Sequence, residues 1–203
     1  VEPGRVLEPL TGPVWGYRRR ARLGVKHVAR KGRVLVGFRE RSAPFVADLH
    51  ECRVLAPPAD RLIDPLAALV GELSIAARVP QVEVAVAGSD CALVLRVLDP
   101  PTAADLDRLR SFERAEGVRV YLQPGGPATV APLTPNLEPL RYELGHFGLA
   151  IEFEPTDFIQ VNATLNEAMV ARAIEILELE PASHVLDLFC GLGNFSLPLA
   201  RSA

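Results

Sequence analysis

A glycine-containing turn near the C-terminal end of the chain carries the residues best suited to binding a cofactor. The apolar run 185–189 leads directly into residues 190–194, which read Cys-Gly-Leu-Gly-Asn, and a segment of helical composition follows. Two glycines allow a tight turn and a close approach of the backbone to a ligand, and the start of a helix offers free N–H groups. The pattern therefore predicts the first strand, turn and helix of a nucleotide-binding α/β domain, with Gly191 and Gly193 beneath the cofactor.

The turn alone leaves the type of cofactor open. The dinucleotide fingerprint requires a third glycine where this chain has Ser196, which disfavours NAD or FAD. Asp187 is expected at the end of the strand, where it orients the turn or contacts the ligand. A Gly-x-Gly sequence also occurs in ordinary loops, so the turn needs support from other features.

A basic segment, residues 17–41, is the second chemically distinctive feature. It contains ten of the 22 Lys and Arg residues and one acidic residue, whereas the rest of the chain has twelve basic and 24 acidic residues. Such a concentration of positive charge in an acidic protein is typical of a surface that binds a polyanion. Arginine forks match phosphate oxygens, which favours RNA or DNA, although a merely solvated basic face is the alternative.

Alternation within this segment predicts a β-hairpin that displays the arginines. Basic residues at 18, 20, 22 and 26 alternate with apolar ones at 17, 21, 23 and 25, the dipeptide Lys31-Gly32 is a turn signal, and 34–38 resembles a returning strand. We expect the nucleic-acid contacts to come from Arg18, Arg19, Arg20 and Arg22.

The remaining patterns predict an α+β domain over residues 1–154, followed by the start of an α/β domain over 155–203. In the first domain we expect hairpins at 81–98 and 142–153, a helix that begins with a capping box at Thr102 and Asp105 and ends at Gly117, a strand at 118–122, and a loop at 123–139. These elements predict a sheet built on antiparallel pairs. In the second domain, Asn162 caps a helix over 163–179.

Composition excludes several classes of protein. With 203 residues, of which 49% are hydrophobic and 23% charged, the chain is globular in class and has no uncharged apolar run long enough to cross a membrane. Three cysteines are too few for a disulfide scaffold and favour a reducing compartment. We therefore expect a cytoplasmic monomer without a membrane partner. A doubly wound sheet needs further strands, and the first residue is Val1, so we expect additional sequence on both sides.

Four segments occur in one order and together resemble the iron-sulfur-containing 23S rRNA uracil-5 methyltransferases. These are residues 16–23 (GYRRRARL), 48–52 (DLHEC), 158–163 (FIQVNA) and 187–195 (DLFCGLGNF). The resemblance covers nearly the whole chain. It implies an α+β central domain followed by the start of a Rossmann-like S-adenosylmethionine-dependent methyltransferase domain, with ribosomal RNA as the partner.

The resemblance also assigns individual residues. It places Gln160, Phe189 and Asn194 at S-adenosylmethionine-contacting positions, and it matches Cys52 to one thiolate ligand of a [4Fe-4S] cluster whose other three ligands we expect before Val1. In the family a cysteine adds to C6 of the flipped uracil, C5 is then methylated, and a base removes the C5 proton. We expect both catalytic groups beyond Ala203, so no catalytic residue is assigned here.

Other interpretations stay open at this stage. Gln160 has an alternative role at the start of the helix, Phe189 has one in the core, and Cys190 is expected to pack as a small buried side chain, like Cys91. The alternative functions are a uracil-5 methyltransferase that acts on tRNA or on another rRNA uridine, and a non-catalytic RNA-binding module.

Overall fold

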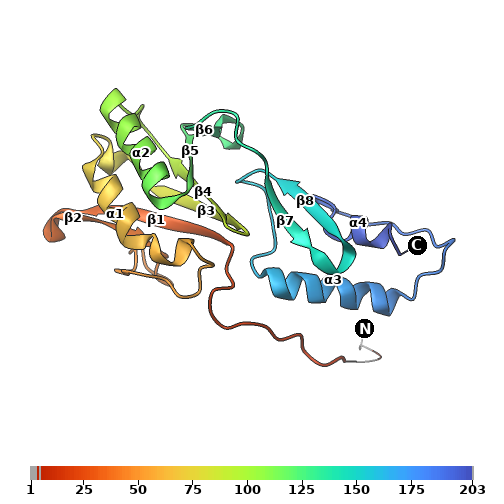
Figure 1. Cartoon of the computed structure of the whole chain (residues 1–203). Helices are drawn as coiled ribbons and strands as arrows, with labels where there is room; N and C mark the ends of the chain where they lie inside the picture. The colour runs from red at the N-terminus through yellow and green to blue at the C-terminus, as the bar shows by residue number, and fades with distance from the viewer. Residues whose placement is uncertain (1–3, 5, 203) are drawn as a thin grey trace.

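A twisted six-stranded sheet forms the larger lobe of the computed structural model, which describes residues 4 and 6–202 (Figure 1). The strand order is β2-β1-β3-β4-β5-β6. The strands are β1 (Arg20–Val28), β2 (Arg33–Gly37), β3 (Gln81–Ala87), β4 (Asp90–Arg96), β5 (Arg119–Gln123) and β6 (Ala131–Pro132). The predicted hairpins β1–β2 and β3–β4 are therefore confirmed.

The expectation of antiparallel pairs alone is wrong at one place. Strand β5 pairs with β4 in the parallel direction, whereas all other neighbours in the sheet are antiparallel. The reason is the connection between them, because helix α2 (Ala103–Glu116) carries the chain back to the start of β4 before β5 begins. Parallel neighbours require a crossover of this kind.

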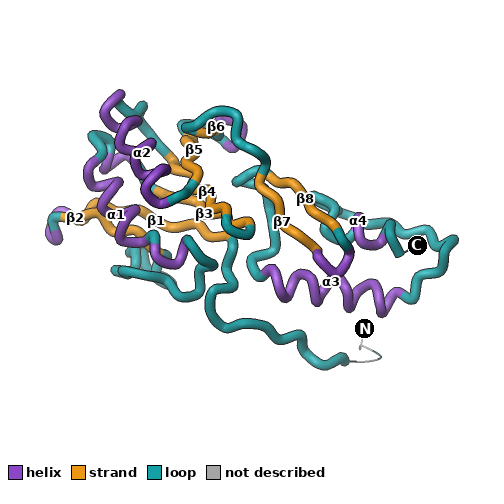
Figure 2. The backbone as a smooth tube through the Cα atoms, viewed as in Figure 1, coloured by secondary structure: helices purple, strands orange, loops and turns teal. Residues whose placement is uncertain are grey.

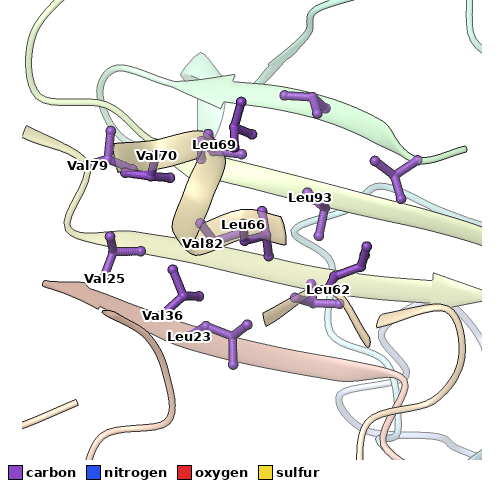
Figure 3. Packing of buried hydrophobic residues seen from close by; sticks show 14 of the residues in the cluster. Leu23, Val25, Val36, Leu62, Leu66, Leu69, Val70, Val79, Val82 and Leu93 are labelled. Carbon is purple, nitrogen blue, oxygen red and sulfur yellow. The ribbon is translucent and has the colours of Figure 1, made fainter. Parts of the chain in front are cut away.

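Helices α1 (Ile63–Glu72) and α2 cover one face of the sheet and enclose the main core (Figure 1). Alternate strand residues such as Leu23 and Val82 point toward Leu66 and Val70 of α1 (Figure 3). Each of these four side chains is at most 1% exposed, and full burial of such a side chain contributes about 1.5–3 kcal/mol. Helix α1 has no counterpart among the predicted elements.

The predicted capping box of α2 is confirmed. The Thr102 hydroxyl oxygen accepts a hydrogen bond from the Asp105 N–H at 3.2 Å, and an Asp105 carboxylate oxygen accepts one from the Thr102 N–H at 2.9 Å. Asp105 also accepts hydrogen bonds from the backbone and hydroxyl of Ser74, which lies beyond the end of α1. Burial alone raises the pKa of the Asp105 carboxyl, but these hydrogen bonds outweigh it and hold the pKa well below its usual value.

A smaller lobe contains the hairpin of β7 (Leu140–Leu144) and β8 (Leu149–Phe153) together with α3 (Ala163–Leu177) and the short α4 (Ser196–Leu199) (Figure 2). The third predicted hairpin is confirmed, and α3 begins after its Asn162 cap as predicted but ends two residues early. A second core cluster joins β7 and β8 to the face of the sheet opposite the main core. Among the described residues no helix has both the length and the apolar character needed to cross a membrane.

The predicted strand 185–189 is wrong, since these residues form loop and turn. Leu186 is 80% exposed and Phe189 is fully exposed, so the alternative of a core role for Phe189 is wrong as well. A strand needs neighbours that satisfy its backbone N–H and C=O groups, and no segment in the described part of the chain pairs with this one.

Candidate functional site

The glycine turn has the backbone conformation that the sequence predicts. Gly191 has φ +57° and Gly193 has φ +87°, values that side-chain-bearing residues rarely adopt. A Cβ atom at Gly193 would lie only 2.9 Å from Cγ of Leu197, so glycine is required there for a second reason. Asp187 accepts a hydrogen bond from the Ser196 hydroxyl at 2.6 Å, which ties the residue before the turn to the start of α4.

The turn borders a cavity of about 360 Å³. Its walls come from both sides of the turn: Ser183, Val185, Asp187, Cys190, Ser196, Leu199 and Ala200. The Cys190 thiol is exposed, so the expectation that it packs in the interior is wrong. The unpaired conformation of the preceding segment explains this exposure, because no sheet formed by the described residues covers it.

Asn194 is held rigidly by the smaller lobe. Its Oδ1 accepts hydrogen bonds from the Tyr142 hydroxyl at 3.1 Å and from Nδ2 of Asn166 at 2.8 Å. Its own Nδ2 donates to Oδ1 of Asn166 at 2.9 Å. The carbonyl oxygen of the Asn194 amide is thus fully used, while one N–H of the amide stays available to a ligand.

Arg19 connects the segment of Gln160 to the same network. The Arg19 N–H donates to the Val161 carbonyl at 2.9 Å, and its Nε donates to the Gln160 carbonyl at 2.7 Å. The guanidinium carbon lies 4.5 Å from the centroid of the Tyr142 ring, in cation–π contact. The structure therefore links two predicted cofactor residues, Gln160 and Asn194, through Arg19 and Tyr142. Phe189 stays outside this network.

Burial distinguishes Arg19 from the other predicted RNA-binding arginines. Arg19 is only 6% exposed, and burial lowers the pKa of its guanidinium from the usual value. Arg19 precedes the first residue of β1, and its guanidinium contacts Tyr142 of the second core cluster, whereas Ala21 and Leu23 of β1 are buried in the main core. The group of arginines expected to contact RNA, Arg18, Arg19, Arg20 and Arg22, is therefore not uniform, because contacts with distant residues bury Arg19.

A single carboxylate neutralises part of the predicted basic face. Glu83 of β3 forms ion pairs with both Arg20 and Arg22, each at 3.0 Å. The Arg20 side chain is 16% exposed, whereas that of Arg22 is 69% exposed. Arg18 is half-buried and Lys26 is exposed. Glu83 lies far from this segment in the sequence, so only the pairing of β1 with β3 reveals its effect.

The described residues do not form a metal site around Cys52. Its thiol is free, half-buried, and packed against the main core. No group of three or more His, Cys, Asp or Glu residues that could hold a metal ion occurs in the described part of the chain. Cys91 is buried as predicted, and burial raises the pKa of its thiol to about 12.

The fold resembles that of a solved RNA methyltransferase. That structure is a Pyrococcus abyssi tRNA (uracil-54, C5)-methyltransferase in complex with S-adenosyl-L-homocysteine. The similarity covers 93% of this chain and 47% of the other, with a TM-score of 0.66 and 17% sequence identity. This likeness confirms a mixed α/β, methyltransferase-like fold. Residues 146–203 also match the profile of a family described as tRNA (uracil-5-)-methyltransferase.

Sequence comparison identifies the family more closely. The chain is 55% identical, over its whole length and 46% of the other protein, to the 23S rRNA (uracil(1939)-C(5))-methyltransferase RlmD of Alkalilimnicola ehrlichii. It is 51% identical, over 98% of the chain and 45% of the other protein, to the RlmD of Cupriavidus necator. The chain is therefore similar over its whole length to RNA uracil-5 methyltransferases, as its motifs indicate. It spans about half the length of these curated relatives.

Proposed function

We propose that this chain serves in the S-adenosylmethionine-dependent methylation of C5 of a uridine in 23S rRNA. The observation that carries the proposal is the 55% identity, over the entire chain, to a protein named for that reaction. Two structural features agree with the proposal, since the reaction needs a cofactor site and a surface that binds a polyanion. They are the Asn194 amide, which hydrogen bonds fix beside the glycine turn, and the basic strand β1. The enzyme would act in the cytoplasm as a monomer.

The two parts of the chain have different roles in this proposal. Residues 1–154 form the central domain, and Arg18, Arg20 and Arg22 of its first hairpin contact RNA phosphates. Residues 155–203 begin the methyltransferase domain. Arg19 has a different role from its neighbours, because its buried guanidinium joins the two parts through the Gln160 carbonyl.

The cofactor would lie along the glycine turn. Gly191 and Gly193 permit its close approach, Asn194 offers its free amide N–H, and Asp187 orients the turn through Ser196. Gln160 would supply its side-chain amide, and the exposed Phe189 ring would be covered by the bound cofactor. When bound, S-adenosylmethionine supplies a methyl group attached to a positively charged sulfur.

We propose the [4Fe-4S] role of Cys52 on the resemblance alone. One half-buried thiol offers one of the four ligands that such a cluster requires, so the described residues do not themselves fit the cluster. Iron and acid-labile sulfide are measured in the complete gene product and in its Cys52→Ser variant. Equal cluster content in both proteins would remove this assignment.

Binding of S-adenosyl-L-homocysteine by the complete gene product tests the cofactor site. Titration calorimetry should show binding that Gln160→Ala weakens and that Gln123→Ala leaves unchanged. Gln123 is a matched control, because it is also half-buried and its side-chain amide makes no hydrogen bond among the described residues. Absence of binding by the unmodified protein would refute the proposed function.

The substrate is tested by mass spectrometry of RNA from a strain that lacks the gene. The proposal expects 5-methyluridine to disappear from one position of 23S rRNA and to return when the gene is restored. A tRNA substrate is the second candidate, because the family that matches residues 146–203 is described as tRNA (uracil-5-)-methyltransferase. Loss of 5-methyluridine from tRNA with rRNA unchanged would establish this alternative instead.

A further inference from the structure

A cavity separate from the cofactor turn lies where the two lobes meet. It encloses about 670 Å³ and is bordered by the segment before β1, the β3–β4 turn, β7 and the start of α3. This volume is within the range of small-molecule sites. None of the six residues proposed for the cofactor lines it. Figure 1 shows the first turn of α3 on the side nearer the lobe that contains β1.

The wall of this cavity includes a buried guanidinium, one nitrogen of which lacks a hydrogen-bond partner. Arg19 uses its Nε for the Gln160 carbonyl and its flat face for the Tyr142 ring. Its Nη2 is buried and has no hydrogen-bond partner, and no carboxylate in the described part of the chain forms an ion pair with it. A buried cation with unused donors favours an anionic ligand, because an unpaired buried donor is unfavourable.

The N-terminus of α3 adds donors to the same cavity. Asn162 caps the helix by accepting a hydrogen bond from the Leu165 N–H at 3.0 Å. The N–H group of Thr164, a residue that lines the cavity, has no partner among the described residues. The first turn contains no acidic residue, so the positive end of this 15-residue helix is uncompensated.

The remaining walls fit a nucleotide better than a free phosphate ion. Tyr17 lines the cavity and offers an aromatic face for an unpaired base. The cavity is far larger than one phosphate, and β1, which carries the exposed Arg22, begins directly after Arg19. The exposed Arg141 and Glu143 lie at its border on β7 and carry opposite charges.

We propose that this cavity binds one nucleotide of single-stranded RNA. Arg19 and the free N–H group of Thr164 hold a backbone phosphate, and Tyr17 stacks on the base. The inference rests on the proposed function, since it names a contact for the same RNA substrate. The buried Arg19 then has two roles, because it connects the two lobes and contacts the phosphate.

A charge reversal at the helix start tests the site without harming the fold. Thr164→Asp places a carboxylate at the second residue of α3, a position where acidic residues stabilise helices, but where this one would repel a phosphate. Ala104→Asp is the matched control, because Ala104 is the exposed second residue of α2 and does not line the cavity. Both changes add one negative charge.

Affinity for a fluorescent single-stranded uridine oligonucleotide is measured by anisotropy with the complete gene product. We expect Thr164→Asp to weaken binding at least about tenfold, which corresponds to about 1.4 kcal/mol, and Ala104→Asp to change it less than about twofold. Photocrosslinking with a 5-iodouridine oligonucleotide should attach at Tyr17. Equal losses in the two variants, or crosslinks only elsewhere, would overturn the site.

The two proposals fail in different ways. Oligonucleotide binding and methyl transfer that are unchanged in Thr164→Asp would remove the cavity site alone and leave the proposed function standing. No oligonucleotide binding by the unmodified protein would remove both. Calorimetry with S-adenosyl-L-homocysteine is run in parallel, and we expect Thr164→Asp to retain the cofactor affinity because Thr164 does not line the cavity at the glycine turn.

Discussion

The hydroxyl of Tyr142 offers a direct test of the network that holds Asn194. In a Tyr142→Phe variant the ring stays, and with it the contact to the Arg19 guanidinium at 4.5 Å and to the Phe153 ring at 5.9 Å between centroids. Only the 3.1 Å hydrogen bond to Asn194 is lost. The Asn194 oxygen keeps its second donor, Nδ2 of Asn166, so no buried acceptor is left without a partner.

The expected loss follows from this geometry. One hydrogen bond contributes about 0.5–1.5 kcal/mol net, and the absence of an unsatisfied acceptor keeps the loss near 1 kcal/mol. With a urea dependence of about 2 kcal/mol per molar, the midpoint of unfolding falls by about 0.5 M. If Asn194 contacts the cofactor as proposed, looser positioning of its amide weakens binding of S-adenosyl-L-homocysteine by at most about fivefold.

Urea unfolding followed by circular dichroism measures the stability change, and calorimetry measures the affinity. Tyr17→Phe serves as the control, because the Tyr17 hydroxyl makes no hydrogen bond among the described residues, and its midpoint should not move. The reasoning is refuted if Tyr142→Phe unfolds at the same urea concentration as the unmodified protein, or if the control loses as much stability.

Three further outcomes are expected. Because the pKa of Asp105 is lowered in the folded state, its contribution to stability is present above about pH 4 and is lost as the pH falls further; Asp105→Asn should therefore show a flatter acid limb in urea unfolding at a series of pH values. At pH 8 a thiol reagent should modify the exposed Cys190 quickly but reach Cys91, whose thiol pKa is about 12, only after unfolding, and equal rates measured by mass spectrometry would contradict this. Arg22→Ala should lower the slope of log affinity against log salt for single-stranded RNA by about 0.7, and an unchanged slope would show that Arg22 makes no phosphate contact.

Local patterns were sufficient for the elements whose hydrogen bonds close within a short stretch of chain. The three hairpins, the capping box of Thr102 and Asp105, and the Asn162 cap were all predicted, because each depends on neighbours only a few residues away. The positive φ values of Gly191 and Gly193 followed from the same kind of signal. The resemblance to RNA uracil-5 methyltransferases, too, was evident from motifs in the sequence.

Contacts between distant segments decided the rest. Arg19 donates a hydrogen bond to the Gln160 carbonyl, 141 residues away in the sequence, and Arg20 donates one to Glu83, 63 residues away. Neither partner can be predicted from a local pattern. The run 185–189 had the composition of a strand but lacked a neighbour to pair with, because backbone groups in a sheet are satisfied only by other strands. The sequence by itself thus determined the elements and their types. The tertiary structure determined which arginines are buried, which are neutralised, and where a cavity with unused donors is formed.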